Sequence, residues 1–326
     1  MPSLPYAELQ AISNYSFLEG GSHPDELVAR AKELGLAALA IADRNTLAGV
    51  VRAHVAAREA GLRLIVGARL ELTPTGKGDP PVLPALICLP TDRAAYGRLC
   101  RLLSLGQMRA EKSRCRIHLD DVAAHAEGQI LIAIPPPGWS WRETRLSGSG
   151  LPQGAPAEGS PGSAGRIIRF PGRNKQGPED PLARLLTRMR RTLAPAQLYL
   201  AASHRLGGDD ELRLSALARI ATAARTPLVA TGDILYHSPE RRPLQDILAC
   251  IRLKTTIDRA GLLLAANAER HLKRPDEMAK LFAAHPQAVA RSLEIAEACR
   301  FSLDELVYEY PDEPVPAGTT AQAHLE

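Results

Sequence analysis

The chain has 326 residues, 45% of them hydrophobic and 23% charged, with a formal net charge of +4 at pH 7. This composition indicates a globular protein with ample core, and the mildly basic charge permits contact with nucleic acid without requiring it. No apolar run approaches the roughly 18 residues of a membrane span, so we expect no membrane partner. The five cysteines are scattered without a C-x-x-C pair, which argues against a zinc ribbon or disulfide scaffold and predicts a reducing cytoplasm.

The first 72 residues set the pattern of the chain. The apolar run 36–42 lies between Gly35 and Asp43 and is typical of a strand covered on both faces. Ser22 is the candidate N-cap of the helix before it, and Gly35 fits the left-handed position after that helix. We expect strands over 9–12, 37–42 and 63–67 and helices over 24–34 and 46–60. Two βαβ units in succession predict one parallel sheet.

The same alternation continues to residue 231. We expect strands over 84–89, 130–134, 198–202 and 227–231, and helices over 92–106, 119–125, 180–193 and 209–224. These elements give about seven βα units, a count typical of a barrel-like α/β fold. Residues 147–165 are rich in Gly, Ser and Pro, which predicts a disordered insertion. After Asp233 only helices are expected, over 244–251, 275–282 and 286–299, as if the chain led into a longer protein.

A basic segment runs from Arg93 to Arg116. It holds seven Lys or Arg residues and one acid, Glu111. One interpretation is a solvated helix face followed by a loop. The other is a surface that meets nucleic acid or another acidic partner.

Polar residues gather where the predicted strands end. They are Glu19, Asp43, Arg44, Arg69, Glu71, His204, Asp233 and His237. Carboxylates and imidazoles in such a cluster can bind a divalent metal ion. However, each arginine repels a unit positive charge 4 Å away by ~4 kcal/mol at an effective dielectric constant near 20, and arginine cannot lose its proton. The other interpretation is therefore a set of ion pairs, such as Arg69 with Glu19 or Asp233.

Several motifs resemble a known family. Residues 7–20, 40–49, 61–69 and 228–236 resemble the motifs of PHP domains, the polymerase and histidinol phosphatase superfamily. Residues 22–30, 236–252 and 267–273 resemble the error-prone branch of C-family bacterial DNA polymerases. The resemblance implies an α/β fold, a PHP-type distorted (β/α)7 barrel over residues 1–242, followed by a short helical segment over 243–326 that leads towards a polymerase palm.

The resemblance also implies where metal ligands would stand. Active PHP domains hold up to three metal ions through nine ligands, mostly His with Asp, Glu or Cys. By this resemblance the ligand positions fall at Gln10, Ile12, Glu19, Arg44, Arg69, Ala85, Pro135, Asp233 and Leu235. Only Glu19 and Asp233 retain a ligating group there. We therefore expect no catalytic residue, no cofactor and no metal in this chain, with magnesium expected only in the palm of the parent polymerase.

The predicted function is the N-terminal PHP domain of an error-prone translesion polymerase acting in damage tolerance and mutagenesis, itself a catalytically inactive scaffold. The expected partners are the palm and thumb of the same polymerase, DNA through the parent enzyme, other mutasome proteins and the sliding clamp. One alternative is an active 3′–5′ exonuclease or phosphoesterase using Asp43, His204, Asp233 and His237. A second is a DNA- or partner-binding module using the Arg93–Arg116 segment.

Overall fold

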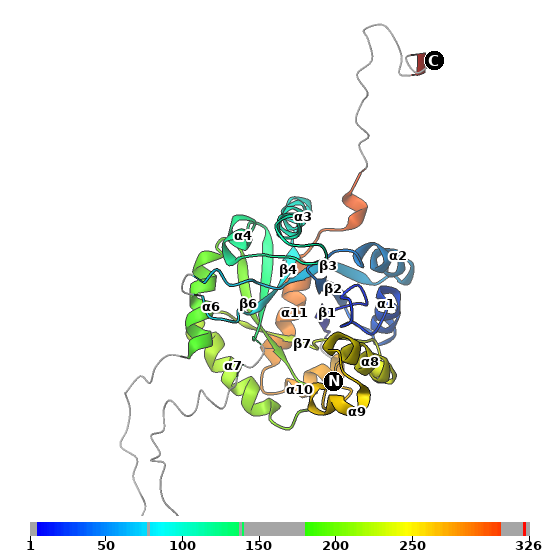
Figure 1. Cartoon of the computed structure of the whole chain (residues 1–326), viewed down its shortest axis with the longest axis vertical. Helices are drawn as coiled ribbons and strands as arrows, with labels where there is room; N and C mark the ends of the chain where they lie inside the picture. Colours follow the sequence, from blue (N-terminus) through cyan, green and yellow to red (C-terminus); the bar gives the residue numbers. More distant parts are fainter. Residues whose placement is uncertain (1–4, 77–78, 137–138, 140–179, 308–321, 324–326) are drawn as a thin grey trace, which may run out of the picture.

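The computed structural model describes residues 5–76, 79–136, 139, 180–307 and 322–323. A ring of helices surrounds a seven-stranded sheet (Figure 1). The strands are β1 (Ala7–Ala11), β2 (Ala38–Arg44), β3 (Arg63–Leu70), β4 (Ala85–Pro90), β5 (Gln129–Ile134), β6 (Gln197–Ser203) and β7 (Leu228–Thr231). The α-helices are α1 (Pro24–Glu33), α2 (Val50–Ala60), α3 (Arg93–Met108), α4 (Leu119–Ala124), α6 (Pro181–Thr192), α7 (Asp210–Ala224), α8 (Arg242–Leu253), α9 (Ile257–Ala260), α10 (Pro275–Leu281) and α11 (Pro286–Ala298). The predicted insertion at 147–165 lies outside the described residues.

The strands follow one another in chain order, and the α/β barrel-like class is confirmed. β1, β2 and β3 are parallel, as are β5, β6 and β7, but β4 runs antiparallel to both of its neighbours. The expectation of a uniform βα alternation is therefore wrong between β3 and β4. The described part of the connection 71–84 contains no helix, and a parallel return would have needed a crossover.

Side chains help to close the barrel between β1 and β7. Two backbone hydrogen bonds join these strands near their ends, from Ile234 N to Gln10 O at 2.9 Å and from Ile12 N to Ile234 O at 3.1 Å. The Glu8 carboxylate accepts from Gly232 N at 2.8 Å, and Gln10 Oε1 accepts from Thr231 Oγ1 at 2.8 Å. The side chains of Glu8 and Gln10 thus accept hydrogen bonds from Gly232 and Thr231 at a junction where β1 and β7 share only a few backbone hydrogen bonds.

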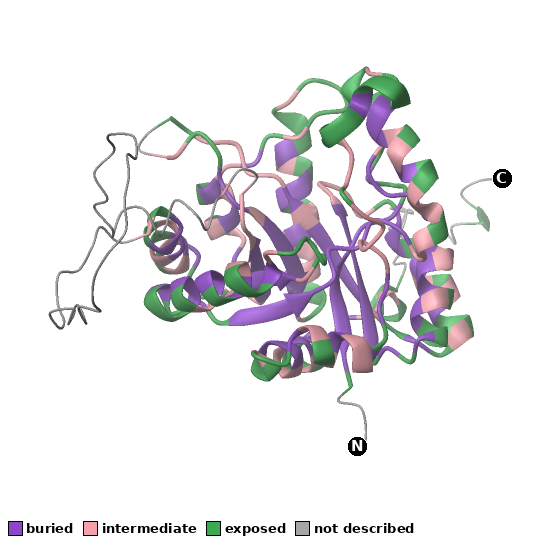
Figure 2. Cartoon of the chain, turned by 90° about the horizontal axis from the view of Figure 1, so that it is seen from below, coloured by how far each residue is buried: buried purple, intermediate pink, exposed green. Residues whose placement is uncertain are grey.

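Two apolar layers hold the fold together. The inner layer is built largely from alanines of β1 and β2 with larger residues of the other strands, and α11 contributes Ile295, Ala296 and Cys299 to it. Ala7 N donates to Ser292 Oγ at 3.2 Å, which ties α11 to β1. The outer layer packs the strands against the helices, so that in Figure 2 the strands are purple and the helices are purple only on their inner sides.

The helix ends follow local signals with two corrections. α1 begins with His23 as its N-cap, not Ser22, because the Glu26 carboxylate accepts from His23 N at 2.8 Å. Gly35 and Gly61 take the left-handed conformation expected after their helices, with φ of 72° and 61°. α2 begins at Val50 rather than residue 46, and Asn45 before it has a φ of 53°. The preceding residues form a turn instead of helix.

Candidate functional site

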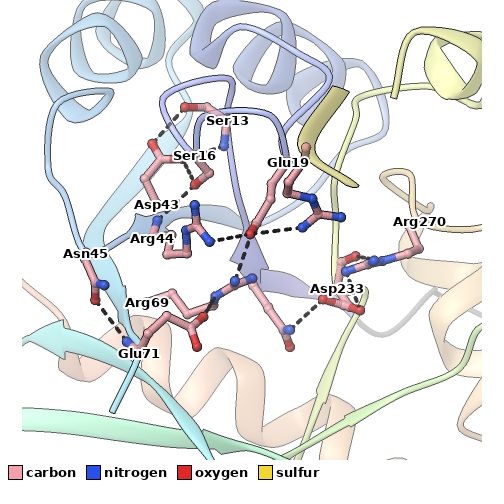
Figure 3. Close-up of polar contacts among 12 residues, drawn as sticks. Ser13, Ser16, Glu19, Asp43, Arg44, Asn45, Arg69, Glu71, Asp233 and Arg270 are labelled. Carbon is pink, nitrogen blue, oxygen red and sulfur yellow. Dashed lines mark hydrogen bonds and ion pairs between the residues drawn. The ribbon is translucent and has the colours of Figure 1, made fainter. Parts of the chain in front are cut away.

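Glu19 is held by three arginines at the carboxyl ends of the strands (Figure 3). Its Oε1 lies 2.8 Å from Arg44 Nη1 and 3.3 Å from Arg252 Nη1, and its Oε2 lies 3.0 Å from Arg69 Nη2. The loop after β1 carries Glu19, β2 and β3 carry Arg44 and Arg69, and α8 carries Arg252. The predicted ion pair between Arg69 and Glu19 is confirmed.

Asp233 follows β7 and is held in a similar way. Gln10 Nε2 donates to its Oδ1 at 2.8 Å, and its Oδ2 contacts Arg205 and lies 2.8 Å from Arg270 Nη2. Burial alone would raise the pKa of Asp233, but the charges of Arg270 and Arg205 lower it below the ordinary value. Asp233 is therefore an anion whose oxygens are engaged by protein groups.

Arg69 does not pair directly with Asp233, the other partner considered from the sequence. Its Nε donates instead to Glu71 Oε1 at 2.7 Å (Figure 3). Burial lowers the pKa of Arg69, but the charges of Glu71 and Glu19 outweigh this and raise it. Arg69 is thus a permanent cation at one of the ligand positions that the resemblance implies.

Asp43 is fully buried and serves the loop that follows β1. Its Oδ1 accepts from Ser13 N and Ser16 Oγ, both at 2.7 Å, and its Oδ2 accepts from Ser13 Oγ at 2.7 Å. Burial raises the pKa of Asp43, and these hydrogen bonds oppose the rise. With its oxygens engaged in this way, Asp43 fixes the loop that carries Glu19.

Two implied ligand positions meet as apolar side chains. Ile12 and Leu235 form a small buried cluster together with Tyr236. Their contact fills the space between β1 and the segment after β7 with hydrocarbon. Imidazole ligands cannot be supplied from these positions.

A cleft of about 810 Å³ opens beside Asp233 and Arg69. Of the implied ligand positions, Gln10, Arg69, Ala85, Pro135 and Asp233 line it. Its walls also hold four arginines that the sequence did not single out as site residues: Arg205, Arg213, Arg252 and Arg270. Two of these, Arg252 and Arg270, belong to motifs quoted above, so the resemblance was a signal that could have pointed to them.

The residues of the predicted active enzyme do not meet in this cleft. Asp233 lines it, but Asp43, His204 and His237 do not. The His237 ring lies 2.8 Å from Ser22 Oγ, and burial lowers the pKa of this histidine. His204 Nδ1 lies 3.8 Å from Asp210, whose carboxylate also accepts from Arg213. The four side chains therefore do not form one catalytic group.

The donor set does not fit the metal cluster that the family resemblance implies. Among the described residues, no three His, Cys, Asp or Glu side chains stand close enough to share a metal ion. Cations occupy two of the implied positions, Arg44 and Arg69, and hydrocarbon fills those of Ile12 and Leu235. The two carboxylates that remain are neutralised by guanidinium groups.

The basic segment lies on α3 and the loop after it. Three of its arginines form ion pairs, Arg98 with Glu127 at 2.6 Å, Arg109 with Asp121 at 2.6 Å, and Arg114 with Glu111 at 3.7 Å. The exposed cations that enter no ion pair with described residues are Arg93, Arg101, Lys112 and Arg116.

No described helix is both long and apolar enough to cross a bilayer.

Comparison with known proteins identifies the family. The model of the PHP domain matches residues 8–202, more than half of the chain. An error-prone DNA polymerase of Rhodopseudomonas palustris (strain BisA53) is 46% identical over 337 residues, which cover 98% of this chain and 28% of that protein. One of Caulobacter vibrioides is 42% identical over 320 residues, covering 98% of this chain and 25% of that protein. The chain thus spans about a quarter of the length of these curated relatives.

Similarity to solved structures is weaker. An amidohydrolase from Chromobacterium violaceum, solved with bound sulfate and no metal, matches with a TM-score of 0.45 and 14% identity over 71% of this chain and 88% of its own. The match to the family model and the similarity to error-prone polymerases confirm the resemblance seen in the motifs: the chain belongs to the PHP domain family.

Proposed function

We propose that this chain provides the PHP domain of an error-prone DNA polymerase that acts in translesion synthesis, damage tolerance and induced mutagenesis. Relatives of that name match nearly the whole chain at 42% to 46% identity, which supports the proposal. DNA synthesis itself would reside in the larger part of such a polymerase, with magnesium in its palm. The proposed location is the cytoplasm, where such an enzyme would meet DNA.

Within that polymerase, the domain acts as a scaffold that does not hydrolyse phosphoesters. The supporting observation is that arginines contact both carboxylates that remain at the implied ligand positions, Glu19 and Asp233. Metal-dependent hydrolysis needs ions that activate water and neutralise the leaving oxygen. A guanidinium supplies positive charge but cannot coordinate a water molecule as a Lewis acid does.

Elemental analysis and a nuclease assay test this proposal. The purified protein should contain zinc, manganese and iron well below one ion per chain. A 3′-labelled primer should remain intact with manganese, equally for the wild type and for Asp233→Ala. Primer digestion that Asp233→Ala abolishes would show the chain to be an active exonuclease instead. A stoichiometric metal that is lost in Asp233→Ala would show that the cleft binds a metal ion and would contradict the proposal.

The partners of the scaffold are the palm and thumb of the same polymerase, with mutasome proteins and the sliding clamp as further candidates. α8 supports an interaction role because Leu244, Ile247 and Ile251 lie exposed along one side of it at helical spacing. Ile247→Glu combined with Ile251→Glu should weaken co-purification with the remainder of the polymerase expressed separately. Val55→Glu, an exposed apolar residue on α2, is the matched control. Equal recovery of both variants would argue against this face.

A second candidate function is DNA binding through the Arg93–Arg116 segment. The observation in its favour is the group of exposed cations on α3 and its loop that enter no ion pair with described residues. Binding through phosphates releases counterions, so the affinity for a DNA duplex should fall steeply between 50 and 200 mM salt. Neutralising Arg93 and Arg101 to Gln should reduce that slope by about two. A slope that both substitutions leave unchanged would exclude the segment.

A further inference from the structure

The ion pairs of the cleft leave an excess of positive charge. Five guanidinium groups take part in them, and they face three carboxylates, Glu19, Glu71 and Asp233. The guanidinium groups belong to Arg44, Arg69, Arg205, Arg252 and Arg270. This ion-paired group therefore carries two positive charges more than its carboxylates neutralise. Over all the charged residues that line the cleft, which include Arg213, Asp209 and Asp210 but neither Arg44 nor Glu19, the excess is one positive charge.

Several of these arginines also have N–H donors that take no part in these side-chain contacts. A guanidinium has five N–H donors. The side-chain contacts that Arg69 and Arg270 make with described residues use Nε and Nη2, and those of Arg205 use Nη2. The Nη1 groups of all three enter none of these contacts. All three side chains line the 810 Å³ cleft together with Asp233.

The cations also stand close enough to repel one another. Burial lowers the pKa of Arg270; Asp233 raises it, but the nearby charges of Arg205 and Arg69 lower it further. An anion placed among the three would reduce this repulsion and restore part of the solvation that burial removes. The cleft that these side chains line has room for such an anion.

We propose that this cleft binds a phosphate group through Arg69, Arg205 and Arg270 without a metal ion. A terminal phosphate group carries between 1.5 and 2 negative charges near pH 7, opposite in sign to the positive excess of the cleft. Planar guanidinium groups match the spacing of phosphate oxygens and bind them in a bidentate way. The cleft volume is in the range of small-molecule sites, so the phosphate can carry a larger group. The site goes beyond the scaffold function, because it holds a phosphate group without breaking it.

Titration calorimetry of the full chain with inorganic pyrophosphate in EDTA tests the site. The wild type should show saturable binding with metals removed. Arg205→Gln should weaken the affinity about tenfold, which corresponds to about 1.4 kcal/mol. Arg205 is suited to this test because its side chain is 46% exposed and Asp233 keeps Arg270 as a partner, so the fold should persist. Arg219→Gln, at an exposed position on α7 outside the cleft, should bind like the wild type.

Competition then distinguishes the sources of the phosphate. A short DNA strand with a 5′-phosphate that displaces pyrophosphate, while the same strand without phosphate does not, supports a phosphate presented by a nucleic-acid end. Displacement by neither strand supports a free anion. No saturable binding in EDTA, or equal binding by the wild type and Arg205→Gln, would overturn the inference and leave the scaffold proposal untouched. Pyrophosphate hydrolysis that requires manganese and is lost in Asp233→Ala would overturn both.

Discussion

Glu8 should make the stability of this domain depend on pH. Its side chain is buried in β1, where it accepts hydrogen bonds from Tyr6 Oη, Gln10 N and Gly232 N, each at 2.8 Å. Burial raises the pKa of Glu8 from 4.5 to about 7, although these three hydrogen bonds oppose the rise. The folded state therefore binds a proton more tightly than the unfolded state, and the pKa difference corresponds to about 3 kcal/mol.

The sign of the effect follows from this difference. The stabilising contribution is fully present below pH 4.5 and is lost as the pH rises to about 7, where the buried group becomes charged. Above pH 7 the loss stays constant. Glu8→Gln removes the titratable group. The amide of the new glutamine must, however, point its own N–H donors at the backbone N–H donor of Gly232 or Gln10. This substitution should therefore cost about 1–3 kcal/mol at pH 4.5, where the wild type is protonated.

Denaturant unfolding of both proteins from pH 4.5 to pH 8 measures the effect. The wild type should lose about 3 kcal/mol relative to Glu8→Gln over this range. Taking the difference between the two proteins removes the contributions of groups that titrate in both, such as His237 and His271, whose pKa values burial lowers. A difference that does not change with pH would refute the assignment of a raised pKa to Glu8.

Two further substitutions test the cleft and the loop after β1. Arg69→Glu places a fourth carboxylate beside Glu19, Glu71 and Asp233, and the free energy of unfolding should fall by about 3 kcal/mol or more; an unchanged melting temperature would contradict the proposed electrostatic role of Arg69. Gly49→Ala should destabilise by about 1–3 kcal/mol in thermal unfolding, because its Cβ would lie 2.6 Å from Asp43 Oδ2. Gly97→Ala in α3 is its control and should stabilise by about 0.5–1 kcal/mol, since the Cβ meets nothing closer than 4.0 Å. Equal effects of the two alanines would contradict the packing around Asp43.

The sequence predicted those features that depend on residues close together in the chain. The seven strands are four to eight residues long and largely apolar, and Gly35 and Gly61 stand at helix ends where the chain takes a left-handed conformation. The direction of β4 depends on the connection before it, and that connection carries no pattern that fixes a direction. The start of α2 depends on Asn45, which follows β2. The Oδ1 of Asn45 accepts a hydrogen bond at 2.9 Å from the backbone N of Glu71, which follows β3.

The site was harder to predict because strand ends fix where the backbone lies and not what a side chain contacts. Asp43 and Arg44 are neighbours, yet Asp43 turns to Ser13 and Ser16 while Arg44 reaches Glu19. Arg205 and Arg270 come from a loop and from a segment far along the chain, so only tertiary structure brings them to Asp233.

The retained carboxylates can be explained by charge balance. Glu19 and Asp233 are nearly buried, with 9% and 7% of their side chains exposed, and an isolated buried carboxylate would be costly to ionise. In a metal-binding relative, cations held between the strand ends would offset that cost. Here arginines from β2, β3, α8 and the later loops do so, and their long side chains link strands and helices that a metal ion would otherwise join. Under the proposed scaffold function, guanidinium groups thus supply the electrostatic support of the barrel without the Lewis acid that metal-dependent hydrolysis requires.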